Sequence, residues 1–194
     1  MLDQFDYYWR VEPDVEFHCD IDYDPFLYMQ DNNLKYGFTI SLTEFRKTVP
    51  TLWKTTWQFI QKNPHLINPK NTMAWLTDFW GDYNLCHFWS NFEIADLRLW
   101  RSERYMKYFE HLDRAGGFFY ERWGDAPVHS LAVTMFLQKS EVHWFHDIGY
   151  SHPGATNCPS DANARLRCTC DPEESLDVDG STQCSRKWLQ LPAL

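Results

Sequence analysis

Short strand-like and helix-like segments alternate along this chain, and the alternation limits the choice of fold more than any other feature. Residues 7–11, 15–19, 36–40, 87–92 and 142–145 are rich in β-branched and aromatic residues. Helical patterns over 24–30, 48–63, 102–114 and 125–136 lie among them. Strands and helices in alternation are typical of α/β proteins. The sequence therefore predicts an α/β fold.

The boundaries of two helices can be predicted from their end residues. Ser102 is a favoured N-cap residue, and Gly116 and Gly117 follow the last apolar position of that segment. For the next helix, Asp125 is the expected N-cap and Pro127 lies in the first turn. We therefore expect helices over 102–114 and 125–136.

The length of the chain fits one domain, and its charge argues against one class of partner. With 194 residues, residues 1–194 are expected to form a single unit. Lys and Arg number 18 against 27 Asp and Glu, which gives a net charge of -9. Such a field repels phosphate backbones, so we expect no nucleic-acid partner.

No membrane or export segment is visible in the sequence. No stretch approaches the ~20 consecutive apolar residues that a membrane span needs. The first ten residues also lack the basic and apolar regions of a signal peptide. The residues by themselves therefore predict either a cytosolic protein or one whose targeting segment lies upstream.

The six cysteines indicate an oxidising environment. Cys158, Cys168, Cys170 and Cys184 lie in residues 153–194, which have little periodicity and are expected to form a cysteine-rich loop tail packed on the domain. One residue separates Cys168 from Cys170, which departs from the spacing of zinc hairpins, so disulfides are favoured over a zinc site. Cys19 and Cys86 are expected either to be buried thiols or to pair with each other. The full connectivity stays open, because six cysteines allow fifteen pairings.

Aromatic residues make up 18% of the chain, with 10 Trp, 10 Tyr and 14 Phe. Most aromatic rings fill cores, but Tyr and Trp also present flat amphipathic faces that suit the C–H faces of sugars. The excess favours a protein that handles carbohydrate.

Two acidic clusters near the start of the chain are candidate metal sites. Glu12 and Asp14 lie between the first two predicted strands, and Asp20 and Asp22 follow the second. Carboxylates at strand ends can hold a divalent cation that also binds a diphosphate, as nucleotide-sugar transferases require. Carboxylates are also common at strand ends and helix caps, so spacing alone does not decide between them.

Two further segments combine polar and aromatic residues. Glu93 follows a dense aromatic strand and is a candidate base or nucleophile, although it could instead pair with an arginine. Asp125 closes a second cluster that resembles a cleft wall. From these segments we predict substrate-binding roles for Trp89, Asn91, Tyr120, Glu121 and Arg122.

A histidine cluster is a further candidate. His143, His146 and His152, with Asp147 among them, supply ligand types that suit Mn, Zn or Fe. Their irregular spacing does not place a pair on one helix face, and a single histidine is more often structural.

Four long motifs together resemble a known family, the fungal α-1,2-mannosyltransferases of glycosyltransferase family 15. In family order they are YYWRVEPDVEFHCDIDYDPF (7–26), YNLCHFWSNFEIAD (83–96), FEHLDRAGGFFYERWGDAPVHSLA (109–132) and HWFHDIGYSH (143–152). The resemblance implies a GT-A-like mixed sheet flanked by helices, with the N-terminal strands of the family fold missing from this partial catalytic domain.

The resemblance also implies an activity: retaining transfer of mannose from GDP-mannose to mannosyl acceptors of N- and O-linked glycans and cell-wall mannan. The implied cofactor is Mn²⁺, with Glu12 of the EPD motif and His152 of the GYSH motif as metal ligands, while Asp20 and Asp22 become structural. Glu93 matches the family's proposed nucleophile, and Asp125 matches an acidic active-site residue. The implied location is the Golgi lumen, in a type II membrane protein whose anchor is absent from this chain.

Two alternatives from other classes accompany this hypothesis. A glycoside hydrolase would use Glu12 and Glu93 as its two carboxylates and would need neither metal nor nucleotide. A catalytically incomplete fragment or pseudoenzyme would bind mannan without turnover.

Overall fold

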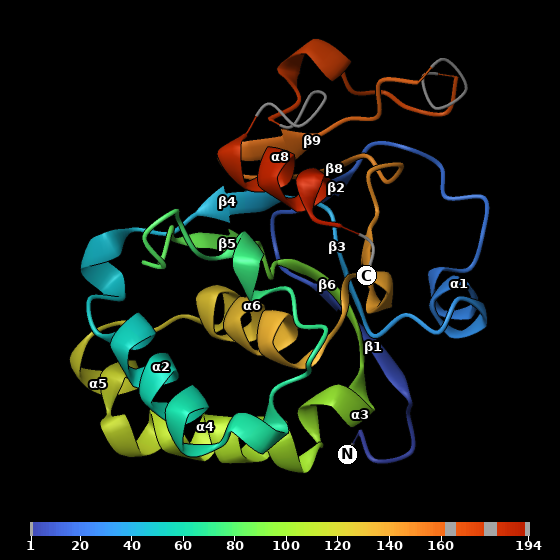
Figure 1. Ribbon diagram of the computed structural model, residues 1–194. Helices are drawn as coiled ribbons and strands as arrows, with labels where there is room; N and C mark the ends of the chain where they lie inside the picture. The colour runs from blue at the N-terminus through green and yellow to red at the C-terminus, as the bar shows by residue number, and fades with distance from the viewer. Residues whose placement is uncertain (1, 162–165, 177–181, 193–194) are drawn as a thin grey trace.

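A four-stranded mixed sheet runs through the middle of the molecule (Figure 1). The computed structural model describes residues 2–161, 166–176 and 182–192. The strand order is β1 (Tyr7–Val11), β6 (Phe92–Asp96), β3 (Tyr36–Phe38) and β7 (Val142–Trp144). β6 is antiparallel to both β1 and β3, whereas β7 is parallel to β3. The predicted mixed sheet and α/β class are confirmed.

Each face of this sheet packs on its own apolar cluster, because side chains alternate between the two faces of a strand. On one face, Tyr36, Phe38 and Ala95 pack with helices α2 (Leu52–Lys62), α4 (Glu103–Ala115) and α6 (Asp125–Phe136). On the other face, Phe92 and Ile94 pack with Phe145, Tyr150 and helix α1 (Pro25–Asp31). The candidate site described below draws residues from both faces of the same sheet.

Helix α4 has the end residues that the sequence predicts. The Ser102 hydroxyl accepts a hydrogen bond from the Tyr105 backbone N–H at 3.3 Å. At the other end, Gly116 adopts the left-handed conformation with φ of 77°, which glycine reaches without the steric penalty of a Cβ atom. The prediction for this helix is confirmed.

The predicted single strand over 87–92 is correct only at its ends, because a turn over 89–91 divides the segment between two strands. β5 (Cys86–Phe88) pairs with β4 (Ser41–Thr43), and β6 begins at Phe92. Between them the Trp89 backbone N–H donates to Ile40, and the Phe92 N–H donates back to the Trp89 carbonyl. Ser90 and Asn91 occupy this turn, as is common for such short polar residues.

Asp125 is not the N-cap of α6. Gly124 has that position and Asp125 is the first helical residue, so the predicted role is wrong by one position. The reason is a tertiary contact: the Asp125 carboxylate accepts hydrogen bonds from Arg10 on β1 and from the adjacent Ala126 N–H.

The tail contains regular structure that its local sequence did not predict. Within the tail, β9 (Ala155–Asn157) pairs with β8 (Tyr150–His152), which lies just before the tail and also pairs with β2 (Glu16–Phe17), in a three-stranded antiparallel sheet. Helix α8 (Gln183–Gln190) buries Trp188 in the main core. The expectation of an irregular tail is therefore wrong for these segments, since non-local pairing and packing create them.

The expected disulfides are confirmed, but the expectation for Cys19 and Cys86 is wrong. The bridges are Cys19–Cys168, Cys86–Cys184 and Cys158–Cys170. Cys19 and Cys86 thus each bind a tail cysteine, and neither is a free thiol. Pairing partners lie 149 and 98 residues apart along the chain, so only the fold brings them together.

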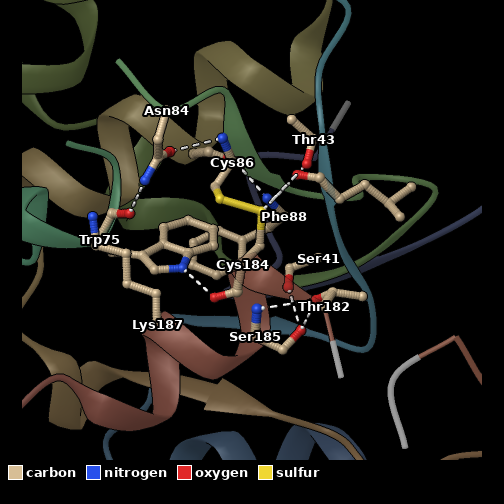
Figure 2. Close-up of a disulfide and its surroundings, with 12 residues drawn as sticks. Ser41, Thr43, Trp75, Asn84, Cys86, Phe88, Thr182, Cys184, Ser185 and Lys187 are labelled. Carbon is tan, nitrogen blue, oxygen red and sulfur yellow. Dashed lines mark hydrogen bonds between the residues drawn. A yellow bond between two sulfur atoms is a disulfide. The ribbon is translucent and has the colours of Figure 1, made fainter. Parts of the chain in front are cut away.

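Figure 2 shows how the Cys86–Cys184 bridge attaches α8 to the core beside β5. The Trp75 indole N–H donates to the Cys184 carbonyl at 2.8 Å, and the Ser41 and Ser185 hydroxyls lie 2.8 Å apart. Several contacts therefore hold α8 in place besides the disulfide.

The remaining elements are short. They are α3 (Leu97–Trp100), α5 (Gly117–Tyr120) and the 3-10 turns Arg46–Thr48, Pro64–Leu66, Met73–Trp75, Lys139–Glu141 and Pro172–Glu174. Among the helices of the described residues, none has the length and apolar character that a bilayer crossing requires.

Candidate active site

Acidic and basic side chains meet where β1 ends and α6 begins. Tyr8, Arg10 and Glu12 alternate along one side of the chain, so they share a face of the sheet as far as β1 extends. The Arg10 guanidinium donates to the Glu12 carboxylate through one nitrogen and to the Asp125 carboxylate through the other. Arg10 therefore brings two predicted site residues, 113 positions apart in the chain, to the same place.

Glu93 lies on β6 directly across the ladder from Arg10 and is 1% exposed. Its carboxylate accepts three hydrogen bonds. The Tyr8 hydroxyl donates to Oε1, the Tyr36 hydroxyl donates to Oε2 at 2.9 Å, and His129 Nδ1 lies 2.9 Å from Oε2. A buried carboxylate needs such partners, because desolvation of an unpaired charge is very costly.

A second layer of side chains holds these donors in place. The Trp100 indole N–H donates to the Tyr8 hydroxyl at 2.9 Å, and the Trp100 ring stacks on His129 with centroids 4.4 Å apart. The position of Glu93 is therefore set by residues from β1, β3, α3 and α6.

The network shifts the ionisation of its members. Burial acts to raise the pKa of Glu93, but the His129 imidazole and the hydrogen bonds from His129, Tyr8 and Tyr36 outweigh it and lower that pKa. Burial and the Glu93 charge raise the pKa of Tyr8 and of Tyr36, and they raise the pKa of Tyr105 to about 12. Glu93 is therefore a fixed negative charge surrounded by neutral phenols at neutral pH.

His152 lies at the end of β8, beside the turn that carries Trp89. The two rings meet edge to face with centroids 5.1 Å apart, so the structure brings these two predicted site residues together. His152 also lines an open hollow of about 460 Å³ with Asp14, Glu16 and Glu174.

Several buried polar atoms around this turn have no hydrogen-bond partner among the described residues. They are His152 Nδ1, the Tyr150 hydroxyl and both side-chain polar atoms of Asn91. Tyr150 lies on the same strand as His152, and its ring contacts the ring of Phe92, the residue next to Asn91. Since buried polar groups are normally satisfied, such a group of unsatisfied atoms is typical of a site that awaits a ligand.

The Glu12 carboxylate acts electrostatically on one of these buried polar groups, the Tyr150 hydroxyl. Burial, followed by the Glu12 charge, raises the pKa of the Tyr150 hydroxyl. Glu12 is about one third exposed at its side chain, so solvent and ligands can reach it. The Glu12 carboxylate and the His152 imidazole are donor types that suit Mn²⁺.

The set of candidate metal ligands in the protein is small. Within the part of the chain that the structure describes, no group of three or more His, Cys, Asp or Glu side chains is placed to hold a metal ion. Two protein donors fit a cation whose other positions are filled by diphosphate oxygens and water, as is common for cations bound together with phosphates. The residues present are therefore compatible with a metal held jointly with a nucleotide.

The second predicted substrate-binding segment is only partly engaged. Tyr120 is 90% exposed, and Arg122 is also exposed. Glu121 instead binds within the protein: it accepts hydrogen bonds from the Thr51 N–H and hydroxyl and from the Trp123 indole at 2.6 to 3.1 Å. In this structure Glu121 holds the start of α2 to the loop before α6.

The other acidic cluster lies against the tail. Asp22 forms an ion pair with Arg167 at 2.7 Å, and the Asp20 backbone N–H donates to the Arg167 carbonyl. These contacts place both residues beside the Cys19–Cys168 bridge, where they join the N-terminal region to the tail.

The predicted histidine cluster does not converge. The His143 ring contacts the Tyr28 ring at a tilt of 54° with centroids 4.9 Å apart, and Asp147 accepts a hydrogen bond from the Tyr23 hydroxyl at 2.8 Å. His146 Nδ1 lies 3.2 Å from the Trp144 carbonyl. Only His152 of this set reaches the candidate site.

Sequence reasoning missed Arg10, Tyr8, Tyr36 and His129. Strand alternation does place Tyr8 and Arg10 on the face of Glu12, and that signal was available from the sequence. No local signal connects Tyr36 or His129 with Glu93, since they lie 57 and 36 residues from it in the chain.

The chain matches a family model and many relatives. The model described as "Glycolipid 2-alpha-mannosyltransferase" matches residues 1–193. Glycolipid 2-alpha-mannosyltransferase 1 of Candida albicans is 56% identical over 98% of this chain and 45% of its own length. The chain spans about half the length of the relatives that it matches.

Two solved structures share the fold. Core-mannan synthase A from Aspergillus fumigatus, in a Mn/GDP form, superposes with a TM-score of 0.84 at 52% identity, covering 90% of this chain and 48% of that chain. The mannosyltransferase Ktr4p from Saccharomyces cerevisiae, in complex with GDP, has a TM-score of 0.89 at 43% identity, covering 97% of this chain and 51% of that chain.

Proposed function

The chain belongs to the glycolipid 2-alpha-mannosyltransferase family, and on this premise we propose that it is part of a retaining α-1,2-mannosyltransferase. The donor is GDP-mannose, and the acceptors are mannosyl residues of N- and O-linked glycans and of cell-wall mannan. The observation that carries the proposal is the group of unsatisfied buried polar atoms on Asn91, Tyr150 and His152 beside the Glu12 carboxylate. The related core-mannan synthase A in its Mn/GDP form supports both the metal and the nucleotide.

Glu12 and His152 would hold Mn²⁺ in this proposal. His152 Nδ1 is buried and has no hydrogen-bond partner among the described residues, as expected of an imidazole whose partner is a ligand. When bound, Mn²⁺ offsets the negative charge that develops on a departing diphosphate. Arg10, which joins Glu12 to Asp125, keeps both carboxylates oriented at the mouth of the site.

Glu93 acts as a fixed charge in this scheme. The transition state of glycosyl transfer has the character of an oxocarbenium ion, and a preorganised carboxylate stabilises positive charge of this kind. All of its hydrogen bonds come from Tyr8, Tyr36 and His129, and it is almost fully buried. This enclosure supports an electrostatic role for the Glu93 carboxylate.

The first test is calorimetric titration of GDP into the chain, with and without Mn²⁺, after a cooperative thermal melt has been recorded. We expect GDP binding that depends on Mn²⁺ and is abolished by Glu12→Ala and by His152→Ala. Asp22→Ala is the matched control, since Asp22 pairs with Arg167 in the tail. Three results would contradict the proposed donor site: GDP binding that does not depend on Mn²⁺, GDP binding that is unchanged in Glu12→Ala, and no GDP binding to the folded chain.

The second test is mannose transfer. Incubation with GDP-mannose, Mn²⁺ and α-mannobiose, followed by mass spectrometry and linkage analysis, should show an α-1,2-linked trisaccharide. Release of mannose without nucleotide or metal would indicate the glycoside hydrolase instead. Metal-dependent GDP binding with no product would indicate the catalytically incomplete fragment.

We also propose that the protein acts in the Golgi lumen and is attached there as a type II membrane protein. The three disulfides support an oxidising compartment, since such bonds are rare in the cytosol. Co-fractionation of the cellular protein with a Golgi marker, together with protection from added protease in intact vesicles, is the expected result. Full digestion in intact vesicles would contradict the lumenal location.

A further inference from the structure

A group of aromatic rings is exposed on the outer side of α2, built from elements that the candidate active site does not use. Phe79 is 92% exposed, Trp80 is 84% exposed and Trp57 is 47% exposed. Trp57 and Trp80 line, with Trp53, a hollow of about 600 Å³ that we call the Trp80 groove. Large aromatic rings normally contribute to burial, so several exposed together on one hollow indicate a binding surface.

The loop that presents Trp80 is held rigidly by its own hydrogen bonds. The Asp78 carboxylate accepts from the backbone N–H groups of Trp80 and Asp82, each at 2.9 Å. The Asp78 N–H donates to the Asp82 carbonyl, and Gly81 turns the chain with φ of 85°. The backbone that carries Trp80 is therefore ordered before any ligand arrives, which lowers the entropy cost of binding.

The wall of the groove is also fixed. Trp53 stacks on Tyr83 with centroids 5.6 Å apart and planes 19° apart. Trp53 and Trp57 are one helical turn apart on α2, and their centroids lie 6.1 Å from each other. Two neighbouring indole rings on α2 thus line the groove together with Trp80.

The polar lining of the groove fits a neutral ligand that carries hydroxyl groups. Gln58 and Gln61 contribute side-chain amides, each of which can both donate and accept hydrogen bonds. The charged lining residues are one lysine, Lys54, and one aspartate, Asp82. The groove is therefore close to neutral, in a chain with a net charge of -9, and charge complementarity favours an uncharged partner.

We propose that the Trp80 groove is a carbohydrate-binding site for a neutral mannose oligosaccharide, separate from the site of transfer. Pyranose rings present apolar C–H faces that suit the indole faces of Trp53, Trp57 and Trp80, while their hydroxyls suit amide side chains. The choice of mannose as the sugar rests on the proposed function. The groove holds an oligosaccharide on the protein surface without contributing to the chemistry.

The experiment is titration of α-1,2-mannotriose into the full chain without GDP or metal, followed by calorimetry and saturation-transfer NMR. We expect weak binding that Trp80→Ala reduces roughly threefold to tenfold, the value of one aromatic contact. The double variant with Trp57→Ala should lose the part of the binding that the groove contributes. Phe45→Ala is the control, because Phe45 is 78% exposed and does not line the groove.

Folding and the donor site are controlled separately. Trp80 is so exposed that Trp80→Ala should keep the thermal melt unchanged, and Glu12→Ala should keep mannotriose binding unchanged. Loss of metal-dependent GDP binding with mannotriose binding intact would overturn only the proposed function. The reverse result would overturn only the groove proposal.

Three results overturn the groove proposal. They are absence of mannotriose binding to the folded chain, equal binding by the wild type and the double variant, and equal losses in Trp80→Ala and Phe45→Ala. Sedimentation gives a further check: self-association that Trp80→Ala removes would show that a second copy of the chain occupies the groove instead of a saccharide.

Discussion

Replacement of Glu93 by glutamine tests the central feature of the candidate site, a buried carboxylate that accepts from three donors. The substitution keeps the size of the side chain and removes its charge. In the better orientation, the amide oxygen takes the place of Oε2 and still accepts from Tyr36 and His129. The amide NH2 group then faces Tyr8, whose hydroxyl already accepts from Trp100. The Tyr8 proton is left with no acceptor.

The cost follows from these contacts. A buried hydrogen bond to a charged group contributes about 1.5–3 kcal/mol, and a buried donor without a partner costs about 1–3 kcal/mol. These two energies are not fully additive, since the lost hydrogen bond and the unsatisfied donor both belong to the Tyr8 contact. We therefore expect Glu93→Gln to lower the free energy of unfolding by about 2–4 kcal/mol at pH 7.

The assay is urea unfolding followed by tryptophan fluorescence and circular dichroism, with Tyr8→Phe and the double variant completing a mutant cycle. The cycle should give a coupling energy of about 1–3 kcal/mol between residues 93 and 8. Glu110→Gln, which disrupts an exposed pair with Arg114, should leave the curve unchanged. A wild-type-like curve for Glu93→Gln would refute the argument, because it would mean that the carboxylate is not needed by its donors.

The Glu93 network also predicts a dependence on pH. The pKa of Glu93 is lowered in the folded chain, so its contribution to stability is present above the unfolded value of about 4.3 and is lost as pH falls through the folded pKa. The acid limb of the stability curve should therefore be steeper in the wild type than in Glu93→Gln.

Three further predictions concern the fold around the site. The double variant Cys86→Ala with Cys184→Ala removes the bridge between residues 98 positions apart. Because the unfolded chain is then less restricted, we expect the free energy of unfolding, measured in urea, to fall by about 4 kcal/mol. A loss under 1 kcal/mol would argue against this bridge. Gly37→Ala should cost about 1–3 kcal/mol in the same assay, since a Cβ there lies 2.4 Å from the Phe145 ring; an unchanged midpoint would contradict the close packing. Burial, partly opposed by a nearby aspartate, lowers the pKa of His143, so the unfolded chain binds the proton first and stability should fall below about pH 6.5, by at most about 1.4 kcal/mol per pH unit. His143→Gln should flatten that part of the curve, and an identical slope in the variant would count against it.

Some features of the protein followed from local sequence because their causes are local. The cap of Ser102 and the left-handed Gly116 act within a few residues of the helix that they bound, so the helix over 103–115 was predictable. The proline and acidic residues after Val11 likewise predicted the end of β1 and the position of Glu12. The motifs that indicate the family are contiguous segments, so they needed no structure either.

Other features were decided when distant segments packed together. The segment over 87–92 looked like one strand because aromatic residues lie on both sides of its short polar turn, and only pairing with β4 and β1 divided it. Cys19 and Cys86 each pair with a tail cysteine because an isolated β-bridge joins Cys168 to Cys19 and α8 packs beside β5. Local patterns carry no information on contacts at such separations.

The candidate site divides along the same line. The sequence alone indicated the candidate residues, namely Glu12, Glu93, Asp125 and His152. Only the tertiary structure decided their states: Arg10 joins Glu12 to Asp125, while Glu93 is enclosed by Tyr8, Tyr36 and His129. The physical reason is that ionisation and access depend on burial and on the nearest charges, and both arise from how the sheet and its helices pack rather than from neighbours in the chain.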